Sequence, residues 1–398
     1  MLVTQSQDKL INLQFILLFL QAMCCNCYVA IFYCMEQWMV KLAISPNWRG
    51  ILLALLALMV FVTRPLVTYF LLGKNKTWPM IGSILVASLT LLSYPLVPQD
   101  FAIPVIAALR IIQGIALAVY SSCTTTLLVN CIPAGQSARG FALFSLTLLL
   151  PFAILPAIGE GLIIITGGEA QLFAWTAILG IPALATLRPL YQAMQTKLPP
   201  ARRSASLAHM RQSFHIKNLG LVYLACFCFT MMTNQAIFFI KGLCQIIHSV
   251  PAYFFTTYTS TIILVRLLGN TLLDRLPKAI VIITTAVILA ICIGGMGYTQ
   301  GLGLIPLAFV YGLAMGLHYP LLAALVYDRS SQDARTLNSN IMMAAFDASA
   351  FAAPILGGLV INFGYGYQGV FISAAICIII CGASITLDTI IQRYLKFS

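Results

Sequence analysis

The chain has 398 residues, of which 61% are hydrophobic and only 8% are charged. A soluble domain carries roughly 25% charged residues, so this composition excludes a soluble globular fold. The formal net charge of +12 does not indicate nucleic-acid binding, because the basic residues are not clustered on one helix or tail.

Long apolar segments recur along the chain from Leu10 to the C-terminus. A helix needs about 20 apolar residues to cross the ~30 Å hydrocarbon core of a bilayer, so these segments predict an all-α membrane protein. The first segment is too long for the apolar core of a signal peptide and lacks a small-residue cleavage site, so we expect it to stay in the mature protein. The twelve predicted transmembrane helices are 11–38, 50–72, 78–98, 101–130, 138–165, 170–194, 217–247, 252–273, 279–298, 302–327, 337–363 and 368–391.

Basic residues are distributed unevenly between the two ends of these spans. With the N-terminus inside, most of them fall on the inner side, and only Lys41, Arg49 and Lys241 fall on the outer side. An excess of Lys and Arg is typical of cytoplasmic loops. We therefore predict a multi-pass protein of the bacterial inner membrane with both termini in the cytoplasm.

Most of the 12 cysteines lie inside predicted spans, which argues against a disulfide framework. Cys24, Cys25 and Cys27 could bind a soft metal such as Cu(I). No His-rich or Met-rich motif accompanies them, so packing as small apolar side chains is the favoured interpretation. We predict no metal site and no cofactor.

One long polar segment, from Gln195 to Lys217, separates six predicted spans from the other six. It is rich in Lys, Arg, Ser and Pro. We therefore predict an N-terminal six-helix bundle over residues 1–194, a cytoplasmic linker over 195–217 and a C-terminal six-helix bundle over 218–398.

Three short matches at nearly constant spacing relate the two halves and indicate an internal duplication. Many secondary transporters are built from such six-helix repeats, with the substrate site near the bilayer midplane. The matches pair Arg64 with Arg266, then Gln113, Gly114 and Tyr120 with Tyr311, Gly312 and His318, and finally Pro156 and Gly159 with Pro354 and Gly357.

Ionisable residues are unevenly distributed among the spans. Each costs about 2.5–3.5 kcal/mol inside a membrane helix on insertion scales, so each is expected to face protein or a water-filled cavity. The third, sixth, ninth and twelfth spans carry none in their interiors, which predicts that these four helices face lipid and that the others surround a polar pathway. The ionisable residues in or beside the other spans are Glu36, Arg64, Arg110, Glu160, Lys241, Arg266, His318 and Asp347.

Uncharged polar residues mark the first and seventh spans. Gln14, Gln21 and Tyr28 recur every seven residues and therefore share one helix face, with Asn26 close to it. The seventh span carries Asn234 and Gln235 in its middle, after Thr230 and Thr233. These side chains either bind a substrate or join neighbouring helices, at ~0.6 kcal/mol for each hydrogen bond.

The whole chain resembles the major facilitator superfamily, and in particular its bacterial drug and sugar efflux branch. RIIQG, from Arg110 to Gly114, is similar to the fourth-helix motif, in which the arginine is associated with proton coupling. The segment from Ser137 to Leu162 is similar to the fifth helix of exporters, and MAAFDASAFAAP around Asp347 looks like its partner in the eleventh helix. The resemblance implies two pseudo-symmetric six-helix bundles and a monomer.

The loops that carry the gating motif of the family depart from its pattern. In TYFLLGKNK, Leu72 stands where the family has an Asp, and of the motif's charges only Lys74 and Lys76 remain. The second half keeps Asp274 and Arg275 in NTLLDRLPK, with Asn270 in place of the glycine. The resemblance thus implies a charge latch in the second half but not in the first.

The leading hypothesis is a secondary transporter that moves a small organic solute by alternating access, as a proton-coupled efflux antiporter. The chain has no Gly-rich phosphate loop ending in Gly-Lys-Ser/Thr, which argues against ATP hydrolysis. In this hypothesis Glu36, Glu160 or Asp347 exchanges a proton, because desolvation favours a neutral carboxyl group and the nearby Arg110 favours a charged one.

Each of the remaining candidate residues also has a structural interpretation. Lys241 binds an anionic substrate or extends outward to solvent. His318 with Tyr319 forms a proton relay, or the histidine is a hydrogen-bonded structural residue. Arg64 and Arg266 bind helix termini and contribute to gating.

Other functions remain open at this stage. A proton-coupled importer of a nutrient or iron-chelate fits the same fold, and the degraded first gating motif would suit a transporter-like sensor that carries nothing. A membrane-embedded enzyme is disfavoured, because no Ser/His/Asp or paired-His constellation occurs. The expected partners are a small-molecule substrate, protons and the lipid bilayer.

Overall fold

The computed structural model describes residues 9–71, 75–133, 135–195 and 219–397, and in these ranges it contains helices and no β-strand. Local signals set several helix ends. The side chain of Asn12 accepts a hydrogen bond from the backbone N–H of Phe15 and so caps the first helix. Gly167, with φ of 89°, ends another helix in the left-handed conformation, which glycine adopts without strain.

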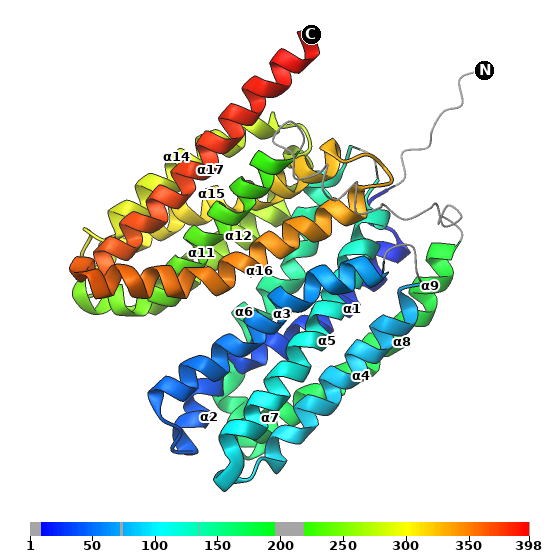
Figure 1. Ribbon diagram of the computed structural model, residues 1–398, viewed down its shortest axis with the longest axis vertical. Coiled ribbons are helices and arrows are strands. Elements are labelled where there is room, and N and C mark those ends of the chain that lie inside the picture. The colour runs from blue at the N-terminus through cyan, green and yellow to red at the C-terminus, as the bar shows by residue number, and fades with distance from the viewer. Residues whose placement is uncertain (1–8, 72–74, 134, 196–218, 398) are drawn as a thin grey trace. The chain divides into compact units, whose positions relative to one another are not determined.

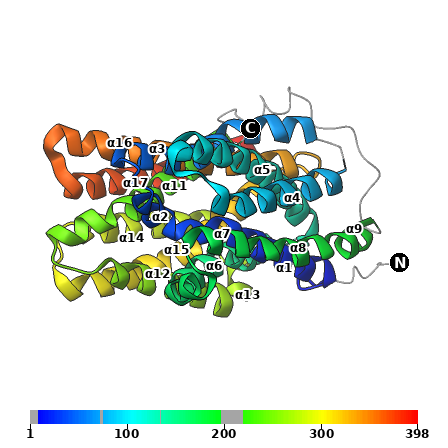
Figure 2. The same ribbon diagram turned by 90° about the horizontal axis from the view of Figure 1, so that it is seen from below.

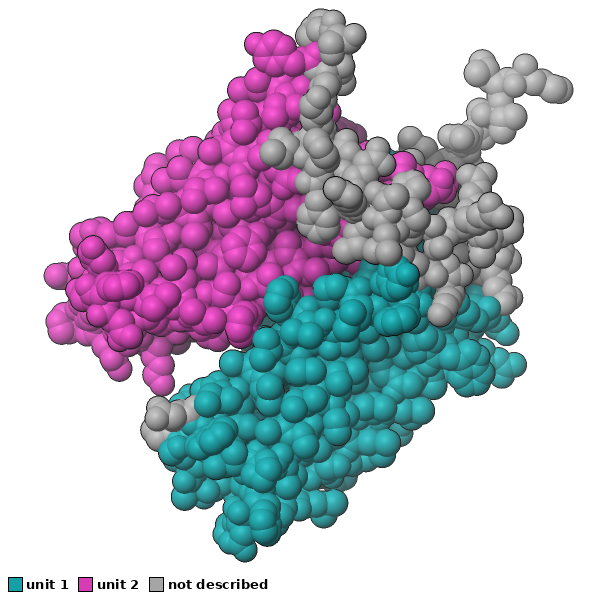
Figure 3. Space-filling model, in the orientation of Figure 1, with its two compact units in different colours: residues 1–136, 144–204 teal, residues 137–143, 205–398 magenta. Residues whose placement is uncertain are grey.

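Two compact units make up the chain, coloured separately in Figure 3. Unit 1 comprises Met1–Gln136 and Phe144–Ser204, and unit 2 comprises Ser137–Leu143 and Ala205–Ser398. The predicted linker 195–217 lies, apart from Gln195, outside the described residues.

Figure 1 colours the N-terminal helices in chain order, from blue through cyan to green. Helix α6 begins in unit 2 and continues into unit 1. The elements are α1 (Leu13–Ala30), η1 (Ile31–Cys34), α2 (Met35–Lys41), α3 (Pro46–Leu71), α4 (Thr77–Ser93), η2 (Tyr94–Leu96), η3 (Gln99–Phe101), α5 (Ala102–Cys131), α6 (Ser137–Thr166), α7 (Glu169–Thr176), η4 (Ala177–Leu179), α8 (Gly180–Ala185) and α9 (Leu187–Gln195).

In unit 2, α11 packs on α16 and α17, α12 packs on α15, and α14 packs on both α15 and α17 (Figure 1, Figure 2). The elements are α11 (Gly220–Ile246), α12 (Pro251–Leu268), α13 (Asn270–Leu273), α14 (Lys278–Met296), η5 (Gly301–Gly303), α15 (Leu304–Arg329), α16 (Arg335–Val360), η6 (Ile361–Tyr365) and α17 (Gly366–Phe397).

Ten helical segments among the described residues are long and apolar enough to cross a membrane. The last of them, Arg335–Tyr394, contains both α16 and α17, and α12 is a further helix of 18 residues that is not among the ten. Counting α16 and α17 separately and adding α12 gives the twelve predicted helices. The predicted all-α fold is therefore confirmed.

Matched glycines show that the two halves pack their helices in the same way. A Cβ atom on Gly114 of α5 would lie 2.6 Å from Cβ of Met59 on α3, and one on Gly312 of α15 would lie 2.8 Å from Cβ of Thr261 on α12. Small residues let membrane helices approach closely, where dispersion contacts replace the hydrophobic effect. The two units therefore repeat one crossing, between α3 and α5 and between α12 and α15.

This crossing predicts a position-specific cost for the smallest possible substitution. We expect Gly114→Ala to lower the melting temperature of the purified protein, because overpacking costs about 1–3 kcal/mol. Gly82→Ala is the matched control, since a Cβ atom on Gly82 of α4 would meet nothing within 4 Å. Equal melting temperatures for the two variants would contradict the close crossing.

Candidate functional site

Arg110 is a buried cation that no carboxylate neutralises among the described residues. Its side chain is 3% exposed, and its Nε donates only a long hydrogen bond of 3.4 Å to the carbonyl oxygen of Leu52 on α3. The guanidinium carbon lies 4.5 Å from the ring centroid of Phe32, a cation–π contact. Nη1 has no hydrogen-bond partner among the described residues. This nitrogen is thus able to bind an acceptor group.

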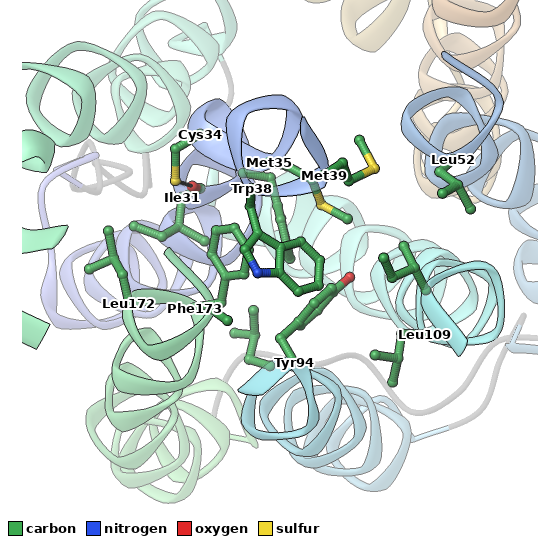
Figure 4. Packing of buried hydrophobic residues seen from close by; sticks show 14 of the residues in the cluster. Ile31, Cys34, Met35, Trp38, Met39, Leu52, Tyr94, Leu109, Leu172 and Phe173 are labelled. Atoms are coloured by element: carbon green, nitrogen blue, oxygen red, sulfur yellow. Dashed lines mark hydrogen bonds between the residues drawn. The ribbon is translucent and has the colours of Figure 1, made fainter. Parts of the chain in front are cut away.

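Aromatic rings from four elements pack together in this part of unit 1, and Figure 4 shows three of them, Trp38, Tyr94 and Phe173. Phe32 of η1 lies 4.9 Å from Phe173 of α7 between ring centroids, and Trp38 of α2 lies 5.6 Å from Tyr94 of η2. The Tyr94 hydroxyl donates to Oε1 of Gln113, one turn after Arg110, over 3.5 Å. The four rings belong to one cluster of buried hydrophobic residues, and in such an environment an unsatisfied N–H is costly.

The polar residues of α1 divide into two groups. The Tyr28 hydroxyl lies 2.7 Å from Oγ of Ser88 on α4, and Nδ2 of Asn26 donates to Oγ1 of Thr147 on α6 over 3.1 Å. Both therefore join α1 to neighbouring helices. Gln21 is fully buried, and neither of its amide atoms has a partner among the described residues.

Two predicted acids of unit 1 differ in what the structure describes. The Glu36 side chain is 62% exposed, and its Oε1 lies 3.9 Å from Nη1 of Arg49. Such an exposed pair contributes ~0–1 kcal/mol. The Glu160 side chain lies outside the described part of the chain.

In unit 2, the two predicted amides of α11 bind neighbouring helices. Nδ2 of Asn234 donates to Oγ of Ser349 on α16 over 3.2 Å, and Nε2 of Gln235 donates to Oγ of Ser373 on α17 over 3.1 Å. Oε1 of Gln235 has no partner among the described residues. Lys241, further along α11, is exposed.

Ring contacts link Arg266 of α12, Tyr319 of α15 and Phe346 of α16, the residue before Asp347. The Arg266 guanidinium carbon lies 5.2 Å from the ring centroid of Tyr319, whose ring is 5.9 Å from that of Phe346. Asp347 follows Phe346 on α16 and is half-buried. These contacts bring α12, α15 and α16 together one residue before Asp347.

His318 is fully buried on α15 and occupied at both ring nitrogens. Nδ1 lies 2.8 Å from Oγ1 of Thr285 on α14, and Nε2 lies 3.5 Å from Sγ of Cys381 on α17. The ring stacks on Phe229 of α11 at 4.7 Å. His318 and Tyr319, considered together from the sequence, therefore contact different neighbours.

The predicted gating residues lie in different environments. Oδ1 of Asp274 accepts a hydrogen bond of 3.1 Å from the backbone N–H of Arg139, in the first turn of α6. Burial raises the pKa of the Asp274 carboxyl above its ordinary value, and this N–H opposes the shift. Arg64 and Arg266 are buried, and Arg275 is exposed. Lys74 lies outside the described residues.

Two buried acids were missed from the sequence, and the expectation that the twelfth span carries no ionisable residue in its interior is wrong. Asp388 of α17 is fully buried and binds Nη1 of Arg329 through Oδ2. Glu169, at the first residue of α7, is also buried and pairs with Lys41. The sequence shows an acid at each position, but the burial depends on how the helices pack.

Solved structures similar to this chain are membrane transporters. The Escherichia coli fucose:proton symporter FucP is 14% identical, with a TM-score of 0.74 over 94% of this chain and 97% of that one. The human organic anion transporter MFSD10 is also 14% identical, with a TM-score of 0.71 over 94% and 99%. A bacterial homologue of the iron transporter ferroportin, in the outward-facing state, is 8% identical, with a TM-score of 0.77 over 95% and 100%.

At these identities the similarity shows the fold. No curated protein sequence matches the chain. The sequence profile of the Major Facilitator Superfamily matches residues 14–302 and 249–389, which together span nearly the whole chain. The chain is therefore a multi-pass membrane protein that belongs to the major facilitator superfamily.

Proposed function

We propose that this protein is a secondary active transporter that moves a small organic solute across a bacterial inner membrane by alternating access, as a proton-coupled exporter. The observation that carries the proposal is family membership along nearly the whole chain. Buried ionisable side chains in both units support it, since such residues mark substrate and ion pathways in membrane proteins. Both termini and the linker would lie in the cytoplasm.

Of the predicted substrate-binding residues Gln21 is best supported, and we add to them Arg110, which the sequence predicts as a proton-coupling residue. Each is buried and has at least one nitrogen without a partner among the described residues. Asn26, Tyr28, Asn234 and His318 are already hydrogen-bonded to neighbouring helices. Since Arg110 has no carboxylate partner among the described residues, its guanidinium favours a polar solute with an anionic group.

Asp347 is the leading candidate for proton exchange in this proposal. It follows Phe346 on α16. The ring of Phe346 contacts that of Tyr319, and the Arg266 guanidinium lies over the Tyr319 ring. Desolvation favours its neutral form and a nearby cation favours its charged form, so a conformational change that alters either would bind or release a proton. Glu36 and Glu160 remain secondary candidates.

Import is the runner-up for the direction of transport. One similar structure is a fucose:proton symporter and another is a bacterial homologue of an iron transporter. Exporter-like features of α6 favour efflux. A proton-coupled exporter moves the solute against the flow of protons, and a symporter moves it with that flow. The direction of solute movement under a known pH gradient therefore separates the two.

Transport is tested first by finding a solute and then by measuring its flux. Thermal-shift screening of the purified protein should identify organic anions that raise its melting temperature more than neutral sugars do. In proteoliposomes containing the wild-type protein, an imposed pH gradient should then drive accumulation of that solute. A stabilising solute that never crosses the membrane would favour a sensor.

Asp347→Asn should abolish solute movement driven by the pH gradient, because the amide cannot bind or release a proton at this position. The matched control is Asp333→Asn, which changes an exposed acid between α15 and α16 and should leave the flux unchanged. Wild-type flux in the Asp347→Asn protein would overturn the assignment.

Asp274 is proposed to latch the first turn of α6 through its bond to the Arg139 N–H. Asp274→Ala should speed hydrogen exchange at that amide by roughly twofold to thirtyfold, since losing a helix cap costs about 0.5–2 kcal/mol. Asp274→Asn keeps an acceptor oxygen and should show a smaller effect, and Asp333→Ala should show none. Unchanged exchange in Asp274→Ala would exclude the latch.

A further inference from the structure

Asp388 is the least exposed of the described acids. Its side chain is fully buried on α17, within an apolar sequence. Oδ2 binds Nη1 of Arg329, and Oδ1 has no hydrogen-bond partner among the described residues. One carboxylate oxygen is therefore available for a proton.

Two ion pairs in series tie three helices together around this acid. Arg329 is the last residue of α15, and the preceding Asp328 lies 2.9 Å from Nζ of Lys278, the first residue of α14. The order is Lys278, Asp328, Arg329, Asp388, with alternating charge from α14 through α15 to α17. We call these four residues the ion ladder. Asp274 lies four residues before Lys278, in the turn that precedes α14.

The ion ladder is absent from the other half of the repeat. The register that pairs Gly114 with Gly312 and Tyr120 with His318 places Asn130 and Cys131 opposite Asp328 and Arg329. Unit 1 thus forms the corresponding helices without these charges. The duplicated architecture therefore does not explain why unit 2 keeps a buried carboxylate.

Two opposing effects set the charge of Asp388. Removal from water favours the neutral acid, and the adjacent guanidinium favours the carboxylate. The Arg329 side chain is 23% exposed, whereas the Asp388 side chain is 1% exposed. The protonation of Asp388 therefore depends on whether Arg329 stays in contact.

We propose that Asp388 is a proton-binding site of unit 2 and that Arg329 is the counter-charge that leaves it when the proton binds. The carboxylate takes up one proton and becomes a neutral acid, and the guanidinium keeps its charge and turns to water. The site adds a proton-binding acid to the proposed transporter, and its use in transport rests on that function. Proton binding itself needs no substrate.

Among the described residues, the helices that pack near Asp388 carry few other charged groups. On α14 and α15 they are Lys278 and Asp328, which pair with each other. Arg335, at the start of α16, binds the Tyr327 hydroxyl over 3.4 Å. Helix α11, which also packs on α17, carries Lys241 as its one charged residue, in its last two turns. Removal of Arg329 should therefore change the protonation of Asp388 more than removal of any of these other groups.

Infrared difference spectroscopy of the purified full chain, recorded while the pH is lowered, tests the site directly. We expect a carboxylic-acid C=O band that Asp388→Asn removes. Arg329→Gln should raise the pH midpoint of that band by about one to three pH units, because it removes the adjacent opposite charge. Glu169→Gln is the matched control, since Glu169 is also a buried acid paired with a basic residue, and it should leave the band in place.

A band that persists in Asp388→Asn, or a midpoint that does not move in Arg329→Gln, would overturn the proposal. If Asp388→Asn alone does not fold, the double variant Asp388→Asn with Arg329→Gln removes both charges and serves in its place. Failure of the proposed transport is recognised separately. A protein without solute flux that shows the Asp388 band refutes the transporter and leaves the proton site standing.

Discussion

The cost of exposing charge to lipid constrains this structure more than any other single effect. Arg110 is buried on α5, while Ile112 and Ile115 of the same helix are exposed. On α17, Asp388 is buried and Leu387 is exposed. Each helix is therefore oriented about its axis so that its ionisable residue meets protein and its apolar residues meet the surroundings. That orientation fixes which side chains face one another inside each unit.

The two units share their packing but not their chemistry. Gly114 and Gly312 permit the same close crossing, and Arg64 and Arg266 are both buried. The register of these matches nevertheless places Ala308 opposite Arg110. The duplicated scaffold thus carries different charged groups in its two halves.

The fold was largely predictable from the sequence, because hydropathy reports the span of each helix directly. The contacts of the polar residues were not. Asn26 binds Thr147 and Asn234 binds Ser349, partners that lie more than a hundred residues away in the chain. Asp388 was missed because it lies near the end of an apolar segment, where an acid is usually solvated. Its burial becomes visible only when other helices, chiefly α11 and α14, are packed on α17.

Within the proposed proton-coupled cycle, arginines and acids have different roles. A guanidinium stays protonated under all physiological conditions, so Arg110, Arg266 and Arg329 are fixed charges. A change of protonation state must therefore occur on a group other than these arginines, and we assign it to a carboxyl group. Glu36 is largely exposed, so a conformational change alters its solvation little. Asp347 is half-buried and Asp388 fully buried, and both lie in unit 2. We therefore assign proton binding mainly to these two acids of unit 2, while unit 1 contributes Arg110, which has no carboxylate partner among the described residues.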